Sequence, residues 1–238
     1  STLFPYTTLF RSPAGPVAIF SLEMSKELLM MRFLASLSRV NAHNLRKGRF
    51  QPADWSRLTT AAQKISESPI YIDDSSDVSV VELRARARRL ATELEAKKTP
   101  LALILIDYIQ IMRGSGRNAE SRQLEVAEIS RSLKGLARDL KVPVVALSQL
   151  SRKTEERGRK DNKPQLSDLR DSGAIEQDAD VVAFIHREGY YNKTDPDVKN
   201  SATIIIGKQR NGPVGEVELV FESEFTKFSD KTVIKDNF

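Results

Sequence analysis

Seven short apolar runs, several of them separated by segments with helical periodicity, constrain the fold of this chain more than any other feature. Several runs are continuous rather than alternating, which is typical of strands in a sheet that is covered on both faces. The pattern predicts an α/β domain with a mostly parallel central sheet and helices on both faces. The expected strands are residues 16–22, 69–74, 101–108, 142–149, 180–186, 202–209 and 216–221, of which the last alternates and is assigned to an edge.

Three amphipathic helices are expected between these strands. Ser25 can cap a helix that runs to about Val40, and Ser79 with Glu82 forms an S-x-x-E capping box for a second helix. Apolar stripes support the second and third helices: Leu83, Ala87, Leu90 and Leu94 in the second, and Val126, Ile129, Leu133, Leu136 and Leu140 in the third.

The composition excludes several classes of protein. There is no cysteine, which rules out disulfides and Cys-based zinc sites and fits a reducing cytoplasm. No apolar run approaches the roughly 18–20 residues of a membrane span, and residues 1–12 lack the features of a signal peptide. The net charge of +5 is compatible with an anionic partner such as nucleic acid. We therefore expect a cytoplasmic protein without a membrane segment.

Polar side chains follow three of the expected strands. Glu23 follows the first, Asp107 ends the apolar run LALILIDY, and Gln149 follows the fourth. In open parallel sheets, ligands bind at the carboxyl ends of the strands. One carboxylate can polarise water, a second can ligate Mg²⁺ and an amide can sense a phosphate, which together indicate nucleotide hydrolysis. Each group alone would more often be a polar group satisfied within its loop, but their convergence on one edge favours function.

Two cations lie at the end of another expected strand. Lys208 and Arg210 fall on the same side of residues 202–209, so they could reach one anion together. The dipeptide Asn211-Gly212 that follows is a strong hairpin signal, and a plain turn is the alternative interpretation. The two interpretations are compatible, because the turn could present the cations.

Other polar segments have simpler explanations. Residues 166–180, LSDLRDSGAIEQDAD, read on physical grounds as a salt-bridged connector, and residues 151–164 as a mobile, solvated loop. The single tryptophan, Trp55, is expected to pack against a helix. A group of arginines fits a solvated helix face better than a nucleic-acid patch: Arg84, Arg86, Arg88 and Arg89.

Five sequence blocks together resemble the C-terminal motor domain of replicative DNA helicases of the DnaB type. The resemblance runs from about residue 16 to about residue 229, in the order of the family's motifs. It implies a RecA-like P-loop NTPase core, ATP and Mg²⁺ as cofactors, and a homo-hexameric ring around single-stranded DNA, with primase and a helicase loader as further partners. The blocks are PVAIFSLEMS, ILIDYIQIM, EISRSLKGLARDLKVPVVALSQLSR, LSDLRDSGAIEQDADVV and IIIGKQRNGPVGEVELVF.

The resemblance also implies roles for individual residues. Glu23 resembles the glutamate that activates the attacking water, Asp107 the Walker B aspartate that holds Mg²⁺, and Gln149 the sensor of the γ-phosphate. Lys208 and Arg210 resemble the pair that enters the neighbouring subunit's nucleotide site, with Arg210 as the arginine finger.

Arg170, Asp171 and Gly173 fall in the family's DNA-contacting loop. Contacts of this kind go mainly to the DNA backbone, which suits a motor that must ignore sequence.

The chain departs from the family pattern before its first expected strand. It contains no match to the phosphate loop G-x-x-x-x-G-K-[ST], and residues 1–15 include no lysine and only one glycine, Gly15. Residues 1–12 resemble a translated cloning or adapter remnant, with a divergent native N-terminus as the alternative. We therefore expect a non-family segment at residues 1–15 and, at 16–238, a partial motor domain lacking its first strand–loop–helix unit and the family's collar domain.

Three functions are open at this point. The first is an ATP-dependent replicative helicase motor that couples hydrolysis to translocation and unwinding, with ATP binding impaired in this chain. The second is a RecA-like recombinase-type ATPase, against which the block at residues 166–180 argues. The third is a non-catalytic module that binds single-stranded DNA or helicase subunits.

Overall fold

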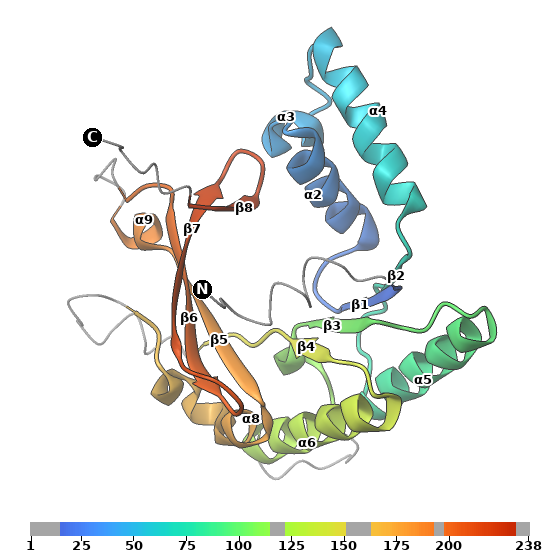
Figure 1. The fold of residues 1–238 in the computed structure, drawn as a ribbon, viewed down its shortest axis with the longest axis vertical. Coiled ribbons are helices and arrows are strands. Elements are labelled where there is room, and N and C mark those ends of the chain that lie inside the picture. The colour runs from blue at the N-terminus through green and yellow to red at the C-terminus, as the bar shows by residue number, and fades with distance from the viewer. Residues whose placement is uncertain (1–14, 115–121, 151–162, 193–197, 232–238) are drawn as a thin grey trace. The chain divides into compact units, whose positions relative to one another are not determined.

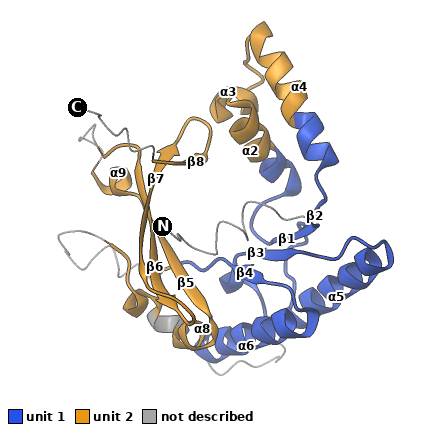
Figure 2. Ribbon diagram, viewed as in Figure 1, with its two compact units in different colours: residues 1–30, 62–149 blue, residues 31–61, 150–238 orange. Residues whose placement is uncertain are grey.

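The computed structural model describes residues 15–114, 122–150, 163–192 and 198–231, with residues 170–172 described by their backbone alone. The chain divides into two compact units: residues 1–30 with 62–149, and residues 31–61 with 150–238 (Figure 2). Most of the expected loop at residues 151–164 lies outside the described residues.

The first unit contains a four-stranded parallel sheet, as the sequence predicts (Figure 1). The strand order is β2-β1-β3-β4, and every neighbouring pair is parallel. All four strands fall within expected ranges, although β4 has only three residues. Their bounds are β1 Val17–Ser21, β2 Ile70–Asp73, β3 Leu103–Asp107 and β4 Val144–Ala146.

Two long helices, α5 (Val80–Ala96) and α6 (Arg122–Leu140), lie along one face of this sheet (Figure 1). The predicted capping box starts α5: the Ser79 backbone N–H donates to the Glu82 carboxylate at 2.9 Å, and the Glu82 N–H donates to the Ser79 hydroxyl at 3.2 Å. The burial of side chains alternates along β3, since Ile104 and Ile106 are fully buried while Leu103 and Leu105 are half-buried. The short 3-10 helix η1 (Ile109–Ile111) follows β3.

The second unit contains a separate four-stranded antiparallel sheet in the order β5-β6-β7-β8. The expected mostly parallel central sheet is the sheet of the first unit, and the last three expected strands, for which the sequence predicted no direction, pair in this second sheet. Antiparallel pairing follows from the short loops after β6 and β7, because parallel neighbours need a long crossover. Strand β8 was not expected. The bounds are β5 Val181–His186, β6 Ser201–Gln209, β7 Gly215–Glu222 and β8 Lys227–Asp230, with η2 Leu166–Ser172, α8 Gly173–Asp178 and α9 Glu188–Tyr191 before or between them.

Three helices lie between β1 and β2 in the sequence: α2 (Lys26–Ser38), α3 (Ala42–Arg46) and α4 (Pro52–Glu67). The predicted cap of the first is present, because the Leu28 N–H donates to the Ser25 hydroxyl at 3.4 Å. Helices α3 and α4 were not predicted. We call residues 31–61, which belong to the second unit, the helical lobe.

The helical lobe meets the β7–β8 hairpin at one junction. Arg39 forms an ion pair with Glu222 and stands 5.6 Å from the ring centroid of Phe225. The Ala42 N–H donates to the Glu224 carbonyl at 2.8 Å. Within the described residues, no helix is both long enough and apolar enough to span a bilayer.

Candidate active site

The register of the parallel sheet brings the two predicted carboxylates to one edge. Ser21, the last residue of β1, lies opposite Asp107, the last residue of β3. The Leu22 N–H continues this pairing by donating to the Asp107 carbonyl at 2.7 Å. Glu23 follows directly and is exposed, whereas Asp107 is half-buried and its peptide bond to Tyr108 is cis. The strand ends therefore deliver both carboxylates to the edge where parallel sheets bind ligands.

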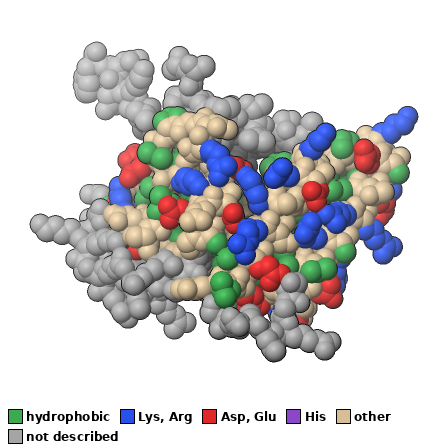
Figure 3. All heavy atoms as spheres, turned by 90° about the horizontal axis from the view of Figure 1, so that it is seen from below, with side chains coloured by type: hydrophobic (Ala, Val, Ile, Leu, Met, Phe, Trp, Pro, Cys, Tyr) green, Lys and Arg blue, Asp and Glu red, His purple; other side chains and the backbone are tan. Residues whose placement is uncertain are grey.

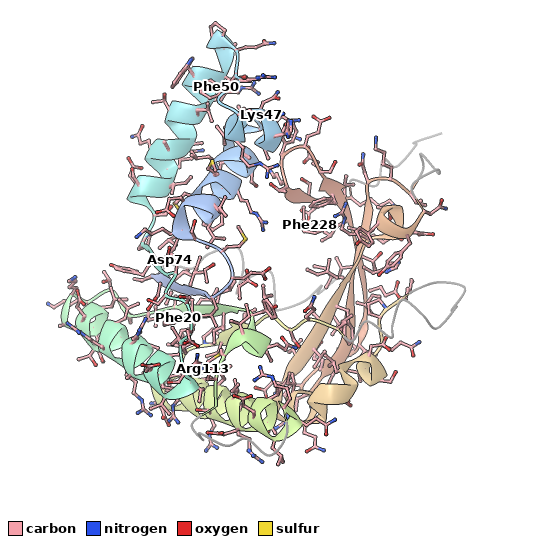
Figure 4. The ribbon with its side chains drawn as sticks, turned by 180° about the vertical axis from the view of Figure 1, so that it is seen from behind. Phe20, Lys47, Phe50, Asp74, Arg113 and Phe228 are labelled. Carbon is pink, nitrogen blue, oxygen red and sulfur yellow. The ribbon has the colours of Figure 1, made fainter. Side chains whose placement is uncertain are left out.

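The turn that carries Glu23 is held by residues that no sequence motif marked. Ser21 is almost fully buried, and its hydroxyl donates to the Met24 carbonyl at 2.7 Å. Asp74, just past β2, accepts the Lys26 N–H at 3.0 Å and so caps α2 (Figure 4). Glu23 thus stands between two fixed points, a buried hydroxyl and a capped helix start.

The third predicted residue, Gln149, follows β4 and is exposed. Its backbone is tied to the end of β3 through Gln110, whose side chain accepts the Gln149 N–H at 3.2 Å and donates to the Gln149 carbonyl at 3.2 Å. The same amide donates to the Ser148 hydroxyl at 2.7 Å. Gln110 therefore fixes Gln149 beside the end of β3. No motif in the sequence pointed to Gln110.

The edge is suited to a metal that takes few protein ligands. Among the residues that the structure describes, no three His, Asp or Glu side chains form a cluster that could hold a metal ion. Mg²⁺ commonly takes one or two carboxylates and completes its octahedron with water and phosphate oxygens. One half-buried carboxylate, Asp107, therefore fits Mg²⁺ better than a metal that needs an all-protein cage.

The residues present do not provide a phosphate cradle. Such a cradle needs a glycine-rich turn of backbone N–H groups, a lysine and a hydroxyl in G-x-x-x-x-G-K-[ST] spacing. The 238 residues contain no match to that pattern. The sheet edge thus presents two carboxylates in a chain whose sequence has no match to the pattern that holds phosphates.

In the second unit, Lys208 and Arg210 point to the same place, as alternation predicted. The Lys208 ammonium donates to the carbonyls of Glu176 and Gln177, the latter at 3.3 Å. The Arg210 guanidinium donates to the same Gln177 carbonyl at 3.2 Å. Both cations therefore bind the carboxyl end of α8, where the helix dipole is negative.

A β-bulge in β6 lies directly before Lys208 and Arg210. Val182 pairs with Lys208 but Ala183 pairs with Ile206, so Gly207 is the extra residue on β6. A Cβ on Gly207 would lie 2.7 Å from the ring of Phe184, which explains glycine there. The hairpin at Asn211-Gly212 is also present, as a five-residue connection between β6 and β7 rather than a two-residue turn.

The predicted DNA-contacting residues lie in helical backbone rather than an open loop. Arg170 and Asp171 belong to η2, and Gly173 begins α8. Gly173 is exposed with a helical φ of −52°, and a Cβ there would meet nothing within 4 Å. Within the described residues, neither the backbone angle nor a steric contact therefore requires glycine at this position.

Two further predictions concern the arginines of α5 and the single tryptophan, Trp55. The arginines of α5 belong to a mixed face in which both charge signs are interspersed (Figure 3): Arg84 and Arg88 share Asp139, at 3.4 and 2.5 Å, as a solvated face predicts. Burial raises the pKa of Asp73, but hydrogen bonds from Ser75 and Arg86 lower it by more. The pKa of Asp73 therefore lies below its usual range.

Trp55, which was expected to pack against a helix, is instead mostly exposed.

Comparisons with known proteins identify the family of the chain. The sequence matches the DnaB-like helicase C-terminal domain family over residues 6–230. It is 55% identical over 212 residues to the replicative DNA helicase DnaB of Geobacillus stearothermophilus, and 54% identical over 212 residues to the replicative DNA helicase DnaC of Bacillus subtilis strain 168. Each alignment covers 89% of this chain and 45% of the relative, so the chain spans about half the length of these relatives.

Solved structures show the same likeness. One, described as an ATPase domain, superimposes with a TM-score of 0.83 at 38% identity, covering 92% of this chain and 75% of that one. A DnaB-like replicative helicase, solved in a study of its interactions with primase, gives a TM-score of 0.84 at 38% identity, covering 92% of this chain and 51% of that one. The fold is therefore that of RecA-like helicase ATPase domains, and the chain belongs to the DnaB-like helicase C-terminal domain family.

Proposed function

We propose that this chain is the motor domain of a replicative DNA helicase, which couples ATP hydrolysis to movement along single-stranded DNA and to duplex unwinding. The observation that carries this proposal is the pairing of Ser21 with Asp107, since it brings Glu23 and Asp107 to one sheet edge. Membership of a helicase family favours this function over a recombinase-type ATPase or a non-catalytic module.

Each residue at the sheet edge has a chemical task under this proposal. Glu23 is exposed and ionisable, so it can accept a proton from the attacking water. Asp107 would hold Mg²⁺, which when bound neutralises charge on phosphate oxygens. Gln149, fixed by Gln110, offers an amide to the terminal phosphate of ATP.

The second unit supplies the parts that make hydrolysis depend on assembly and on DNA. Under the proposal, Lys208 and Arg210 reach the neighbouring subunit's nucleotide in a homo-hexameric ring, with Arg210 as the arginine finger. Arg170, Asp171 and Gly173 contact the DNA backbone.

The position of helix α8 supports a link between DNA contact and the hydrolysis that Lys208 and Arg210 are proposed to assist. It begins at Gly173, and its last turn holds both cations through the Gln177 carbonyl. A shift of α8 on DNA binding would therefore move Lys208 and Arg210.

The remaining assignments follow from the family. We assign the chain to the cytoplasm, to a primosome and to partners that include a helicase loader and primase, the latter named for a solved DnaB-like helicase. Because no phosphate-loop pattern occurs in the sequence, we propose that residues 16–238 are a partial motor domain. Residues 1–15 are proposed as a non-family segment, although the family match includes residues 6–15.

An ATPase assay tests the proposal. The 238-residue chain alone is expected to turn over ATP poorly, because it has no phosphate cradle. We define the loop-restored protein as residues 16–238 preceded by the upstream half of the Geobacillus relative. This protein is expected to show ATPase activity that single-stranded DNA stimulates and to unwind a forked duplex.

Matched variants of the loop-restored protein locate the activity. Glu23→Gln is expected to abolish hydrolysis while ATP still binds, whereas Glu95→Gln, an exposed glutamate on α5, leaves it unchanged. Full activity in Glu23→Gln would refute the assigned role. DNA-stimulated ATPase without unwinding would instead support a recombinase-type enzyme.

A further inference from the structure

The helical lobe concentrates positive charge at one end. Residues 39–57 contain five basic residues and one acidic residue, a net charge of +4, while the whole chain carries +5. Three of the basic residues lie together at the end of α3 and in the turn that joins it to α4. We call this turn and the aromatic pair beside it the basic tip: Arg46, Lys47, Arg49, Phe50 and Trp55.

The backbone of the basic tip is well fixed. The Asn41 side chain caps α3 by accepting the N–H groups of His43 and Asn44, at 2.9 and 3.2 Å. Gly48 then reverses the chain with a φ of +64°, a conformation that favours glycine. Its N–H donates to the Leu45 carbonyl at 3.1 Å. The turn therefore presents its side chains from a defined loop (Figure 4, where Lys47 and Phe50 are labelled).

The cations of the basic tip are not neutralised within the part of the chain that the structure describes. Arg46, Lys47 and Arg49 are exposed, and their side chains form no ion pair there. The one acidic residue of this segment, Asp54, is paired with Arg57 and accepts the Gln51 N–H at 2.9 Å. This differs from α5, where Arg84, Arg86 and Arg88 all meet aspartates.

An exposed aromatic ring stands next to these cations. Trp55 packs edge-to-face on Phe50, with ring centroids 4.8 Å apart and planes at 85°. Even so, Trp55 is 58% exposed. An indole that is held in place yet open to solvent offers a stacking surface, and unpaired cations beside it offer contacts to phosphates. This combination is typical of proteins that bind single-stranded nucleic acid.

We propose that the basic tip is a second binding site for single-stranded nucleic acid. Arg46, Lys47 and Arg49 contact the phosphates, and a base stacks on Trp55. The site is separate from the residues at the start of α8 and requires no nucleotide hydrolysis. An acidic protein segment would match the charges but would leave the indole without a planar partner, so nucleic acid fits the whole constellation better.

Trp55 makes the proposal directly testable, because it is the only tryptophan in the chain. Its fluorescence therefore reports on the basic tip and on nothing else. Titration of the 238-residue chain with an oligothymidylate of about 15 nucleotides at low salt is expected to quench this emission to saturation. With three phosphate contacts, the logarithm of the affinity should fall with the logarithm of salt concentration with a slope of about −2.

Charge-reversal variants distinguish binding at the basic tip from nonspecific attraction of DNA to a positively charged protein. The triple reversal R46E/K47E/R49E is expected to abolish the quenching and to weaken binding at least about tenfold, measured by anisotropy of labelled DNA. The control R89E/R131E/R138E makes the same charge change on exposed positions of α5 and α6 and should retain the quenching. Trp55→Ala should weaken binding at least about fivefold. Circular dichroism establishes that each variant is folded.

Three results would overturn the proposal. The first is DNA binding that leaves Trp55 emission unchanged, and the second is a triple-reversal variant that is folded and binds as tightly as the parent. The third is equal quenching and affinity with polyglutamate, which would show a site for acidic protein. None of these measurements uses ATP, so failure here is distinguishable from failure of the proposed helicase activity.

Discussion

Asp180 and Arg210 are joined twice across the ends of β5 and β6. The Arg210 N–H donates to the Asp180 carbonyl at 2.8 Å, and the Arg210 Nε lies 3.6 Å from the Asp180 carboxylate. With the additional bond to the Gln177 carbonyl, the guanidinium is oriented from two sides. If Arg210 is the proposed arginine finger, a guanidinium held in this way needs little reorganisation when it meets its target, which is the basis of preorganised catalysis.

The first prediction concerns this pair. Asp180→Asn keeps the backbone bond but removes the charge, and an exposed pair of this kind contributes modestly. In the loop-restored protein we expect Asp180→Asn to lower kcat about two- to fivefold at unchanged KM for ATP. Arg210→Ala should lower kcat about 1,000-fold.

The control for Asp180→Asn is Glu218→Gln, which breaks a similarly exposed pair between Glu218 on β7 and Lys231, the residue after β8. That variant should have normal kcat. If Asp180→Asn raised KM and left kcat intact, Asp180 would not act by positioning the finger.

A second prediction concerns Gly173. Since a Cβ at this position would meet none of the described atoms within 4 Å, Gly173→Ala should leave the free energy of unfolding unchanged or slightly raised. If DNA approaches the backbone there, the added methyl group should weaken binding of a labelled oligonucleotide several-fold. Gly135→Ala on α6 is a matched control, because its Cβ position is equally open. Equal DNA affinity of both variants would argue against contact at Gly173.

Local patterns in the sequence predicted the strand positions and the helix cap at Ser79, because these depend on neighbouring residues. They also predicted that Glu23 and Asp107 share an edge, since parallel strand ends meet there. The antiparallel arrangement of β5 to β8 was missed, because apolar content does not specify strand direction. The roles of Gln110 and Asp180 were also missed, because their partners lie 30 or more residues away in sequence.

The third prediction uses the capping box of α5. Ser79→Ala removes the hydroxyl that accepts the Glu82 N–H, so the unfolding free energy should fall by about 1 kcal/mol in urea denaturation. Ser76→Ala, an exposed serine three residues earlier, should have no effect. An unchanged midpoint for Ser79→Ala would mean that α5 is held by packing alone.

The last prediction is a pH dependence at the junction between the helical lobe and the β7–β8 hairpin. A hydrogen bond from the Ser229 hydroxyl, followed by the Arg39 guanidinium, lowers the pKa of Glu222 from its ordinary value of 4.5. A carboxyl whose pKa is lower in the folded state stabilises the fold above its unfolded pKa and loses this contribution as pH falls through the folded pKa. At pH 7 the parent should therefore be more stable than Glu222→Gln.

Urea denaturation of both proteins between pH 7 and pH 3 measures this difference. The gap in unfolding free energy should be constant above about pH 5.5 and should shrink below pH 4.5 as Glu222 becomes protonated. Ser229→Ala should narrow the gap at pH 7, because it removes the larger of the two causes. A gap that grew on acidification would have the wrong sign, and would show that Glu222 is stabilised in its neutral form.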